Sequence, residues 1–159
     1  MKYRIISVGK IKDDFYLRGI NEYLKRLRPY VQIEMIDSLE EKLSPHAGAK
    51  EIEKVLDKEG AKILALINDN DLSIAMDIKG KQLSSEELAG CIEHWNMSGK
   101  ARVNFIIGAS YGLSAQVKQK ADQLISFSRL TFPHHMAVLI LSEQLYRGFK
   151  ILKGEPYHK

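Results

Sequence analysis

The chain has 159 residues, of which 45% are hydrophobic and 28% charged, a composition typical of one soluble globular domain that spans residues 1–159. No apolar run approaches the ~20 residues that a membrane-spanning helix needs, and the apolar stretch in MKYRIISVGK is too short for a signal peptide. We therefore expect a cytoplasmic protein without a membrane partner. Cys91 is the single cysteine, which excludes an internal disulfide and a cysteine-rich zinc site.

The charges are unevenly spread along the chain. Lys and Arg outnumber Asp and Glu by eight to four in residues 1–36 and by nine to three in residues 95–159. Between them, in residues 37–94, the acidic residues lead by thirteen to seven. If the two ends meet in the fold, they form a basic face suited to a polyanion such as nucleic acid. The alternative is a set of scattered, solvated lysines.

The first third of the chain predicts two strands joined by a helix. Residues 3–8 are apolar and rich in β-branched side chains, which indicates a buried strand. Residues 13–27 carry an apolar stripe at helical spacing, and Pro29 ends that helix because proline cannot continue it. Residues 31–36 form the second predicted strand.

The middle of the chain predicts two helices around a third strand. Ser44 and Pro45 resemble a helix start, with a capping serine followed by proline, so we expect a helix from there to residue 67. A strand is expected over residues 72–78. The sequence SSEE is a capping box that opens a helix over residues 84–97.

The last third predicts two further strands, each followed by a helix. Residues 103–107 form a fourth strand, followed by a short helix over residues 114–123 and a short fifth strand over residues 124–127. Pro133 stands at the first position of a long last helix. Because strands and helices alternate, we expect an α/β fold with a mostly parallel sheet and helices on both faces.

Ligands bind at the carboxyl ends of the strands in such sheets, which directs attention to the loops after Met76, Ile107 and Phe127. The segment IIGASYGLS after the fourth strand is glycine-rich and allows close approach of a ligand, but it has neither the GxGxxG spacing nor a Walker loop. The alternative is a plain strand-to-helix turn. On its own the segment is a weak sign of a nucleotide-like ligand.

The next loop, FSRLTFPHH, combines hydroxyls, aromatic side chains and free helix amides. Such a loop can hold an adenosine-like cofactor, although a capped helix with two core aromatics is the alternative. His134 and His135 are adjacent, so on a helix they point about 100° apart and do not chelate together. We therefore predict no metal site.

The C-terminus gathers polar side chains of several kinds. Glu143, Arg147 and Lys150 share one helix face because they are three or four residues apart. The tail that follows combines an aromatic ring, an imidazole and a cation in Tyr157, His158 and Lys159, a mixture suited to stacking on a base and holding phosphate. A solvated helix face and a frayed end are the simpler alternatives.

Three blocks of the sequence, IIGASYGLS, SFSRLTFPHHM and LSEQLYRGFKILKGEPYHK, closely resemble the RlmH family of bacterial methyltransferases of the SPOUT class. The start RIISVGKIKDDFY and the middle DIKGKQLSSEELA are also similar, so the resemblance covers essentially the whole chain. It implies an α/β sheet with a C-terminal trefoil knot, the α/β-knot fold, and a homodimer whose cofactor site lies close to the subunit interface. Periodicity does not predict a knot, because knots are nearly absent from proteins.

The family resemblance also implies an activity: methylation, with S-adenosylmethionine as cofactor, of N3 of a pseudouridine in the 23S ribosomal RNA of the ribosome. Met76 is then expected to line the adenine pocket, where the family often has Leu, and Gly108 is the glycine of close approach. Ala109 stands where a second glycine is common. The loop expected to surround the adenosine and methionine parts consists of Phe127, Ser128, Arg129, Leu130, Thr131 and Phe132.

The catalytic roles are hypotheses from residue chemistry and the family pattern together. N3 carries a proton at neutral pH, so a base should help, and His158 is the first candidate. Tyr157 is expected to stack on or hydrogen-bond the base, and Arg147, oriented by Glu143, to stabilise the developing anion or hold phosphate. The expected RNA contacts are Lys10 and Lys159.

Three other functions are compatible with the residues alone. A Rossmann-like dinucleotide enzyme is one, although GxGxxG is absent. A non-enzymatic ribosome-associated module and a transfer RNA methyltransferase of the same knotted class are the others.

Overall fold

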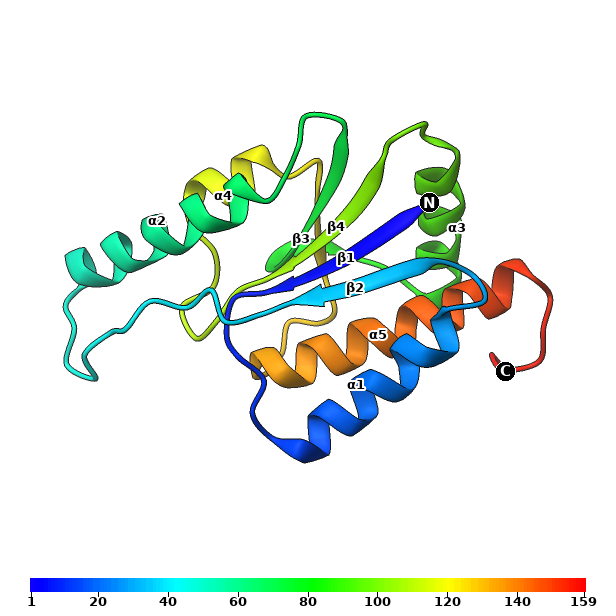
Figure 1. The fold of residues 1–159 in the computed structure, drawn as a ribbon, viewed down its shortest axis with the longest axis horizontal. Coiled ribbons are helices and arrows are strands. Elements are labelled where there is room, and N and C mark those ends of the chain that lie inside the picture. The colour runs from blue at the N-terminus through cyan, green and yellow to red at the C-terminus, as the bar shows by residue number, and fades with distance from the viewer.

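A computed structural model describes residues 1–159 and shows a five-stranded, wholly parallel sheet in the order β2-β1-β4-β3-β5. Strands and helices alternate along the chain, which confirms the predicted α/β class (Figure 1). The strands are β1 (Lys2–Ser7), β2 (Gln32–Ile36), β3 (Asp71–Gln82), β4 (Arg102–Ile107) and β5 (Gln123–Ser126). The helices are α1 (Asp14–Leu27), α2 (Ala49–Ala65), α3 (Ser85–Met97), α4 (Ala115–Lys120) and α5 (His134–Leu152).

Helices cover both faces of the sheet, as the alternation predicts. Successive side chains of a strand point to opposite faces, so Tyr3 and Ile5 pack into the core under α1, α3 and α5, whereas Ile6 and Val8 pack under α2 and α4. None of the helices is long and apolar enough to cross a membrane.

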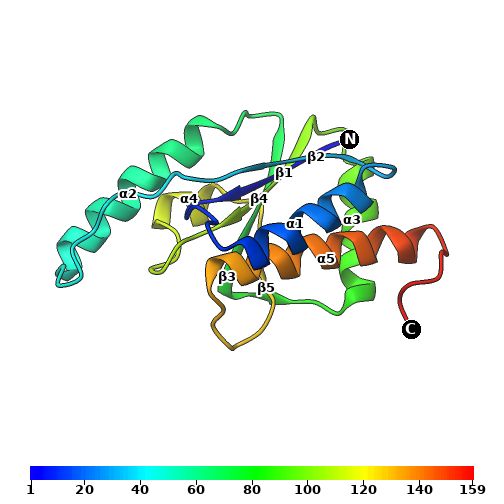
Figure 2. The same ribbon diagram turned by 60° about the horizontal axis from the view of Figure 1, so that its bottom comes forward.

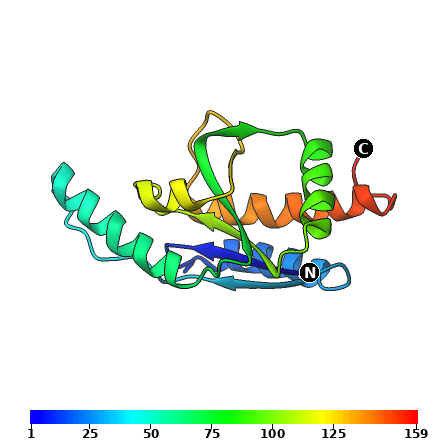
Figure 3. The ribbon, with the colours of Figure 1, turned by 90° about the horizontal axis from the view of Figure 1, so that it is seen from above.

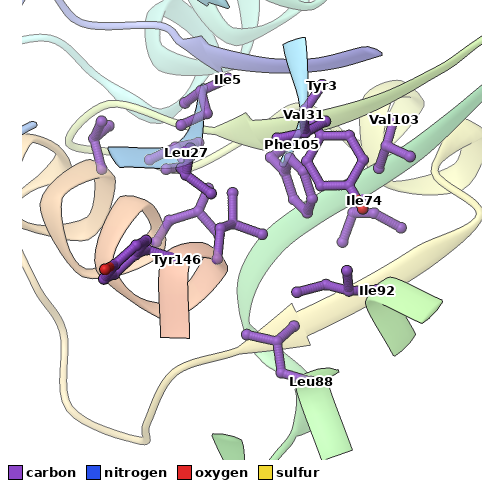
Figure 4. Packing of buried hydrophobic residues seen from close by; sticks show 14 of the residues in the cluster. Tyr3, Ile5, Leu27, Val31, Ile74, Leu88, Ile92, Val103, Phe105 and Tyr146 are labelled. Atoms are coloured by element: carbon purple, nitrogen blue, oxygen red, sulfur yellow. The ribbon is translucent and has the colours of Figure 1, made fainter. Parts of the chain in front are cut away.

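The larger core is mainly aliphatic, with the rings of Tyr3 and Phe105 close together among Ile, Leu and Val side chains (Figure 4). Phe105 of β4 lies between Tyr3 and Trp95, at ring-centroid distances of 5.4 and 5.6 Å. The Tyr3 hydroxyl donates a hydrogen bond to the side chain of Asn96, 2.9 Å away, so its polar end is satisfied. This core joins α3 to the sheet and fixes the direction in which α3 approaches the end of α5.

The two ends of the chain meet, as a basic face requires. Helices α1 and α5 pack side by side over the same face of the sheet (Figures 1 and 2). The Tyr30 hydroxyl, after α1, donates a hydrogen bond to Glu155, after α5.

The start of α2 differs from the prediction. The helix begins at Ala49 after the cap Gly48, and not at Ser44 and Pro45. The Ser44 hydroxyl accepts a 3.3 Å hydrogen bond from the His46 N–H, so it closes a local turn that does not continue as a helix. The predicted start of α3 is confirmed, since Ser84 and Glu87 form the capping box.

Strand β3 is longer than predicted because it passes β5 twice. Met76 and Lys81 are both opposite Ile125, so the pairing register shifts over the four residues between them. Gly80 lies against the β5 backbone, where a Cβ atom would stand 2.6 Å from the Ile125 nitrogen. Figure 3 shows the resulting bend of β3. The trefoil crossing expected of the α/β-knot class stays a prediction at this level of description.

Candidate active site

A cavity of about 840 Å³ opens beside the middle of β3 and the carboxyl ends of β4 and β5, which is the edge of the sheet at which the sequence predicts ligand binding. Its volume lies within the range of small-molecule sites. The segments after Met76, Ile107 and Phe127 all contribute to it, although the residues after Met76 still belong to β3 and do not form the predicted loop. Of the eight residues proposed for the cofactor only Arg129 does not line it. Those that do are Met76, Gly108, Phe127, Ser128, Leu130, Thr131 and Phe132.

An adjoining cavity of about 290 Å³ is mainly apolar. It lies between β5, the start of α3 and the middle of α5, and no charged residue lines it. The two cavities share five wall residues, namely Met76, Ile125, Ser126, Phe127 and Phe132. Together they form a site with one apolar end and one polar end.

The glycines of IIGASYGLS shape the first wall. A Cβ atom at Gly108 would lie 2.4 Å from the carbonyl oxygen of Gly112. Glycine is therefore required here by a close contact within the chain. Gly112 has a φ of +79°, and its N–H donates to the Ala109 carbonyl across 2.9 Å. The turn therefore closes normally with alanine at position 109.

The loop between β5 and α5 is held by its own side chains. The Ser126 hydroxyl donates to the Ser128 carbonyl at 2.9 Å, and the Ser128 hydroxyl accepts from the Leu130 N–H at 3.0 Å. Leu130 is left exposed. Pro133 stands just before the first helical residue, as the cap of α5 and not at its first position as predicted.

His134 and His135 line the larger cavity at the start of α5. The His134 ring packs on Gly9, where a Cβ atom would lie 2.6 Å from its Nε2, and this nitrogen is buried without a hydrogen-bond partner. Burial lowers the pKa of His134, so its imidazole is neutral near pH 7. No group of three His, Cys, Asp or Glu side chains is arranged to hold a metal ion.

The four residues predicted to be catalytic form one cluster around Glu143. Its Oε1 accepts hydrogen bonds from Arg147 and from the Tyr157 hydroxyl, the latter at 2.9 Å. The Arg147 guanidinium also lies over the Tyr157 ring, 4.8 Å from the centroid, and donates to His158 Nδ1 at 3.2 Å. The tail is thus docked on α5 and not frayed. Burial and the bonds of Tyr157 to Tyr23 and Glu143 raise the pKa of its phenol.

Glu86, at the start of α3, is a member of this cluster that the sequence does not reveal. Its carboxylate lies 2.8 Å from His158 Nε2, and Figure 3 shows the C-terminus beside α3. A guanidinium can only donate, so His158 Nδ1 accepts from Arg147 and Nε2 carries the proton that Glu86 accepts. The capping box placed Glu86 in a first helical turn, but no pattern links positions 86 and 158.

The two predicted RNA contacts, Lys10 and Lys159, are both exposed at the surface. Lys10 is exposed and lines a groove of about 530 Å³ that shares Tyr111 with the larger cavity. Lys159 is exposed at the chain end.

The tail cluster and the larger cavity lie at opposite ends of α5. His134 and Arg147 are thirteen residues apart on this helix, which corresponds to about 20 Å at 1.5 Å per residue. Gln144 connects the tail cluster to the smaller cavity. It lines that cavity, accepts a hydrogen bond from the Ser85 hydroxyl and donates one to Glu143 at 2.8 Å.

Comparison with known proteins identifies the family. The family model described as "Predicted SPOUT methyltransferase" matches residues 1–158. The chain is 59% identical to the "Ribosomal RNA large subunit methyltransferase H" of Syntrophomonas wolfei and 50% identical to that of Enterococcus faecalis, in both cases over the full length of both chains.

A solved structure of a "probable methylase family protein" from Haemophilus influenzae has a similar fold. It aligns with a TM-score of 0.52 at 14% identity, over 99% of this chain and 70% of the other. The likeness supports the fold, while the matches in sequence supply the family. The chain belongs to the SPOUT methyltransferase family, together with the enzymes named ribosomal RNA large subunit methyltransferase H.

Proposed function

We propose that residues 1–159 form one methyltransferase domain that transfers the methyl group of S-adenosylmethionine to N3 of a pseudouridine in 23S ribosomal RNA. The observation that carries the proposal is the cavity formed by the middle of β3 and the loops after β4 and β5, in a chain 59% identical to a named ribosomal RNA methyltransferase. A protein that modifies ribosomes works in the cytoplasm.

The walls of the site fit S-adenosylmethionine. Phe127, Phe132 and Met76 provide apolar surface for an adenine ring, and the hydroxyls of Ser128 and Thr131 lie on the polar side. When bound, the cofactor supplies a methyl group made electrophilic by its sulfonium. The protein has to hold the base in line with that group and exclude water, and no covalent intermediate is required.

The tail residues supply the proton chemistry of the proposed reaction. Arg147 carries a permanent positive charge, and its hydrogen bond to Glu143 raises its pKa further, so it is suited to stabilise the anion that forms when N3 loses its proton. The lone pair of His158 Nδ1 can accept this proton. It can do so only after His158 separates from Arg147, which donates a hydrogen bond to this nitrogen in the structure. The docked tail is therefore a resting arrangement.

A homodimer brings the two ends of the site together. One chain places its tail about 20 Å from the start of α5, so we propose that the tail of one subunit completes the cavity of its partner. Phe15 on α1 and Leu130 beside the cavity are 66% and 71% exposed, which leaves apolar surface for such a contact.

The test is to incubate unmodified ribosomes with methyl-labelled S-adenosylmethionine and to map the labelled nucleotide. We expect one pseudouridine of 23S ribosomal RNA to be labelled, and the variant His158→Ala to bind cofactor normally but to label on the order of 100-fold more slowly. Near-normal turnover of this variant would remove His158 as the base. Label on transfer RNA, or ribosome binding without label, would replace the proposed function with one of its two alternatives.

A further inference from the structure

The larger cavity contains one ion pair to which no role has been given so far. The Asp77 carboxylate lies 2.7 Å from the ammonium of Lys118, and both residues line the cavity. The side chain of Asp77 is only 9% exposed, and that of Lys118 is 37% exposed. Charged side chains are rarely removed from water without a partner, so this pair needs an explanation.

Asp77 lies in the middle of β3, level with the carboxyl end of β4. Asp77 follows Met76, which is paired in register with Ile107, and Gly108 follows Ile107. The other carboxylate oxygen of Asp77 accepts from the Lys79 N–H at 2.8 Å, so the carboxylate is fixed. Burial opposes its ionisation, but the bonds from Lys118 and Lys79 prevail and lower the pKa of Asp77, so the pair is charged at neutral pH.

The two cavities divide polar and apolar surface between them. No charged residue lines the smaller cavity, whereas Asp77, Lys79 and Lys118 line the larger one. The neighbouring His134 is neutral near pH 7 because burial lowers its pKa. S-adenosylmethionine is divided in the same way, with a flat adenine at one end and an α-ammonium and α-carboxylate at the other.

We propose that Asp77 and Lys118 bind the amino-acid end of the methyl donor. Asp77 accepts hydrogen bonds from the α-ammonium group, and Lys118 donates to the α-carboxylate. This inference rests on the proposed function, since it assigns two specificity-determining residues to the cofactor site. The protein pair is already fixed before the ligand arrives, so little ordering is needed when a zwitterion of opposite polarity binds.

The simpler explanation is a structural clamp that joins the middle of β3 to α4. A clamp stabilises the fold but does not discriminate between ligands that differ only in their charged groups. Ligand discrimination is therefore the measurement that separates the two roles.

The experiment is isothermal titration calorimetry of the full-length protein with three compounds. They are S-adenosylmethionine, its decarboxylated form, and 5′-methylthioadenosine, which lacks the whole amino-acid end. We expect the wild type to bind S-adenosylmethionine about 10-fold or more tightly than the decarboxylated compound, because a charge-assisted hydrogen bond is lost with the carboxylate.

Two variants and a control complete the test. Lys118→Met should abolish the preference for S-adenosylmethionine over its decarboxylated form. Asp77→Asn should weaken both of these ligands by about 10-fold and leave 5′-methylthioadenosine unchanged. Lys120→Met is the matched control, because Lys120 lies on the same helix, is exposed and does not line the cavity. Thermal unfolding of each variant checks that it folds.

The outcomes are distinguishable. If the wild type binds none of the three compounds, the proposed function is overturned and this inference with it. If the wild type binds all three compounds equally, or if Lys118→Met keeps the full preference of the wild type, the pair is a structural clamp and the proposed function stands without it.

Discussion

At Gly80 the path of the main chain depends on the absence of a side chain. A Cβ atom here would lie within 2.7 Å of three backbone atoms of Leu124 and Ile125, and backbone cannot move aside as the tip of a side chain can. We predict that Gly80→Ala lowers the free energy of unfolding by about 1–3 kcal/mol. Urea denaturation measures this change.

The matched control for Gly80 is Gly90, within α3, where an added Cβ atom meets nothing within 4 Å. Gly90→Ala should stabilise the protein by about 0.5–1 kcal/mol, because alanine loses less backbone entropy in a helix. Equal stability of the two variants would show that β5 does not press on Gly80.

The buried imidazole of His134 makes stability depend on pH. Burial lowers its pKa in the native state, whereas in the unfolded chain it takes up a proton near pH 6.5. The unfolded state thus binds more protons as the pH falls below about 6.5, and stability decreases there. Between about pH 7.5 and 5.5 we expect the urea midpoint of the wild type to fall by on the order of 0.3 M more than that of His134→Gln.

The exposed His46 supplies the control for this titration. His46→Gln should follow the wild type over the same pH range. If His134→Gln also follows the wild type, the pH dependence has another source.

At the scale of elements, the Glu143 carboxylate holds both Tyr157 of the C-terminal tail and the Arg147 guanidinium that bonds His158. Glu143 accepts from both Arg147 and Tyr157, so Glu143→Ala should release the tail while the buried face of α5 stays packed. We expect carboxypeptidase to remove the last residues about 10-fold faster from this variant, because the tail opens more often when charge-assisted bonds are lost. Mass spectrometry follows the digestion. Glu93→Ala, at an exposed position of α3, should be digested like the wild type.

The sequence predicts those elements whose signals are local. The capping serine of α3, the proline before α5 and the β-branched runs of β1 and β4 are short-range features, and each element lies within two residues of its expected position. The helix start predicted at Ser44 is wrong because a serine hydroxyl can close a turn as well as cap a helix. The sequence does not predict the full length of β3, because residues beyond 78 are strand only through pairing with β5, which is distant in sequence.

The same limit applies to the site. Loops at the carboxyl ends of parallel strands meet at one edge of the sheet, so most of the cavity walls follow from the parallel sheet that alternation predicts. Glu86 and the pair of Asp77 with Lys118 are side-chain contacts between separate elements, at 2.8 and 2.7 Å. No periodicity or motif connects such positions.

At the scale of the whole molecule, the proposed dimer predicts complementation between two inactive subunits. Arg147→Ala removes the guanidinium proposed to stabilise the N3 anion. Thr131→Trp places a bulky ring in the cavity wall. In a mixed dimer one of the two composite sites contains neither change. We expect a mixture refolded in equal amounts to recover about a quarter of wild-type activity, since random pairing makes half of the dimers mixed and each has one intact site. Methylation of unmodified ribosomes measures the recovery, and its absence would place tail and cavity of each site in one chain.

The double passage of β3 along β5 also has a consequence during synthesis. Ile125, Phe127 and Phe132 are wall residues of the cavity, and β5 pairs with two segments of β3. A nascent chain that ends before residue 123 can pair four strands, but it lacks the segment that closes the cavity. Translation delivers this segment and α5 after the other four strands, and the contacts of β5 are distant in sequence, so the segment orders slowly. The ability to bind the methyl donor is thus the last property that a new molecule acquires, and unfinished chains cannot withdraw the donor from the cell.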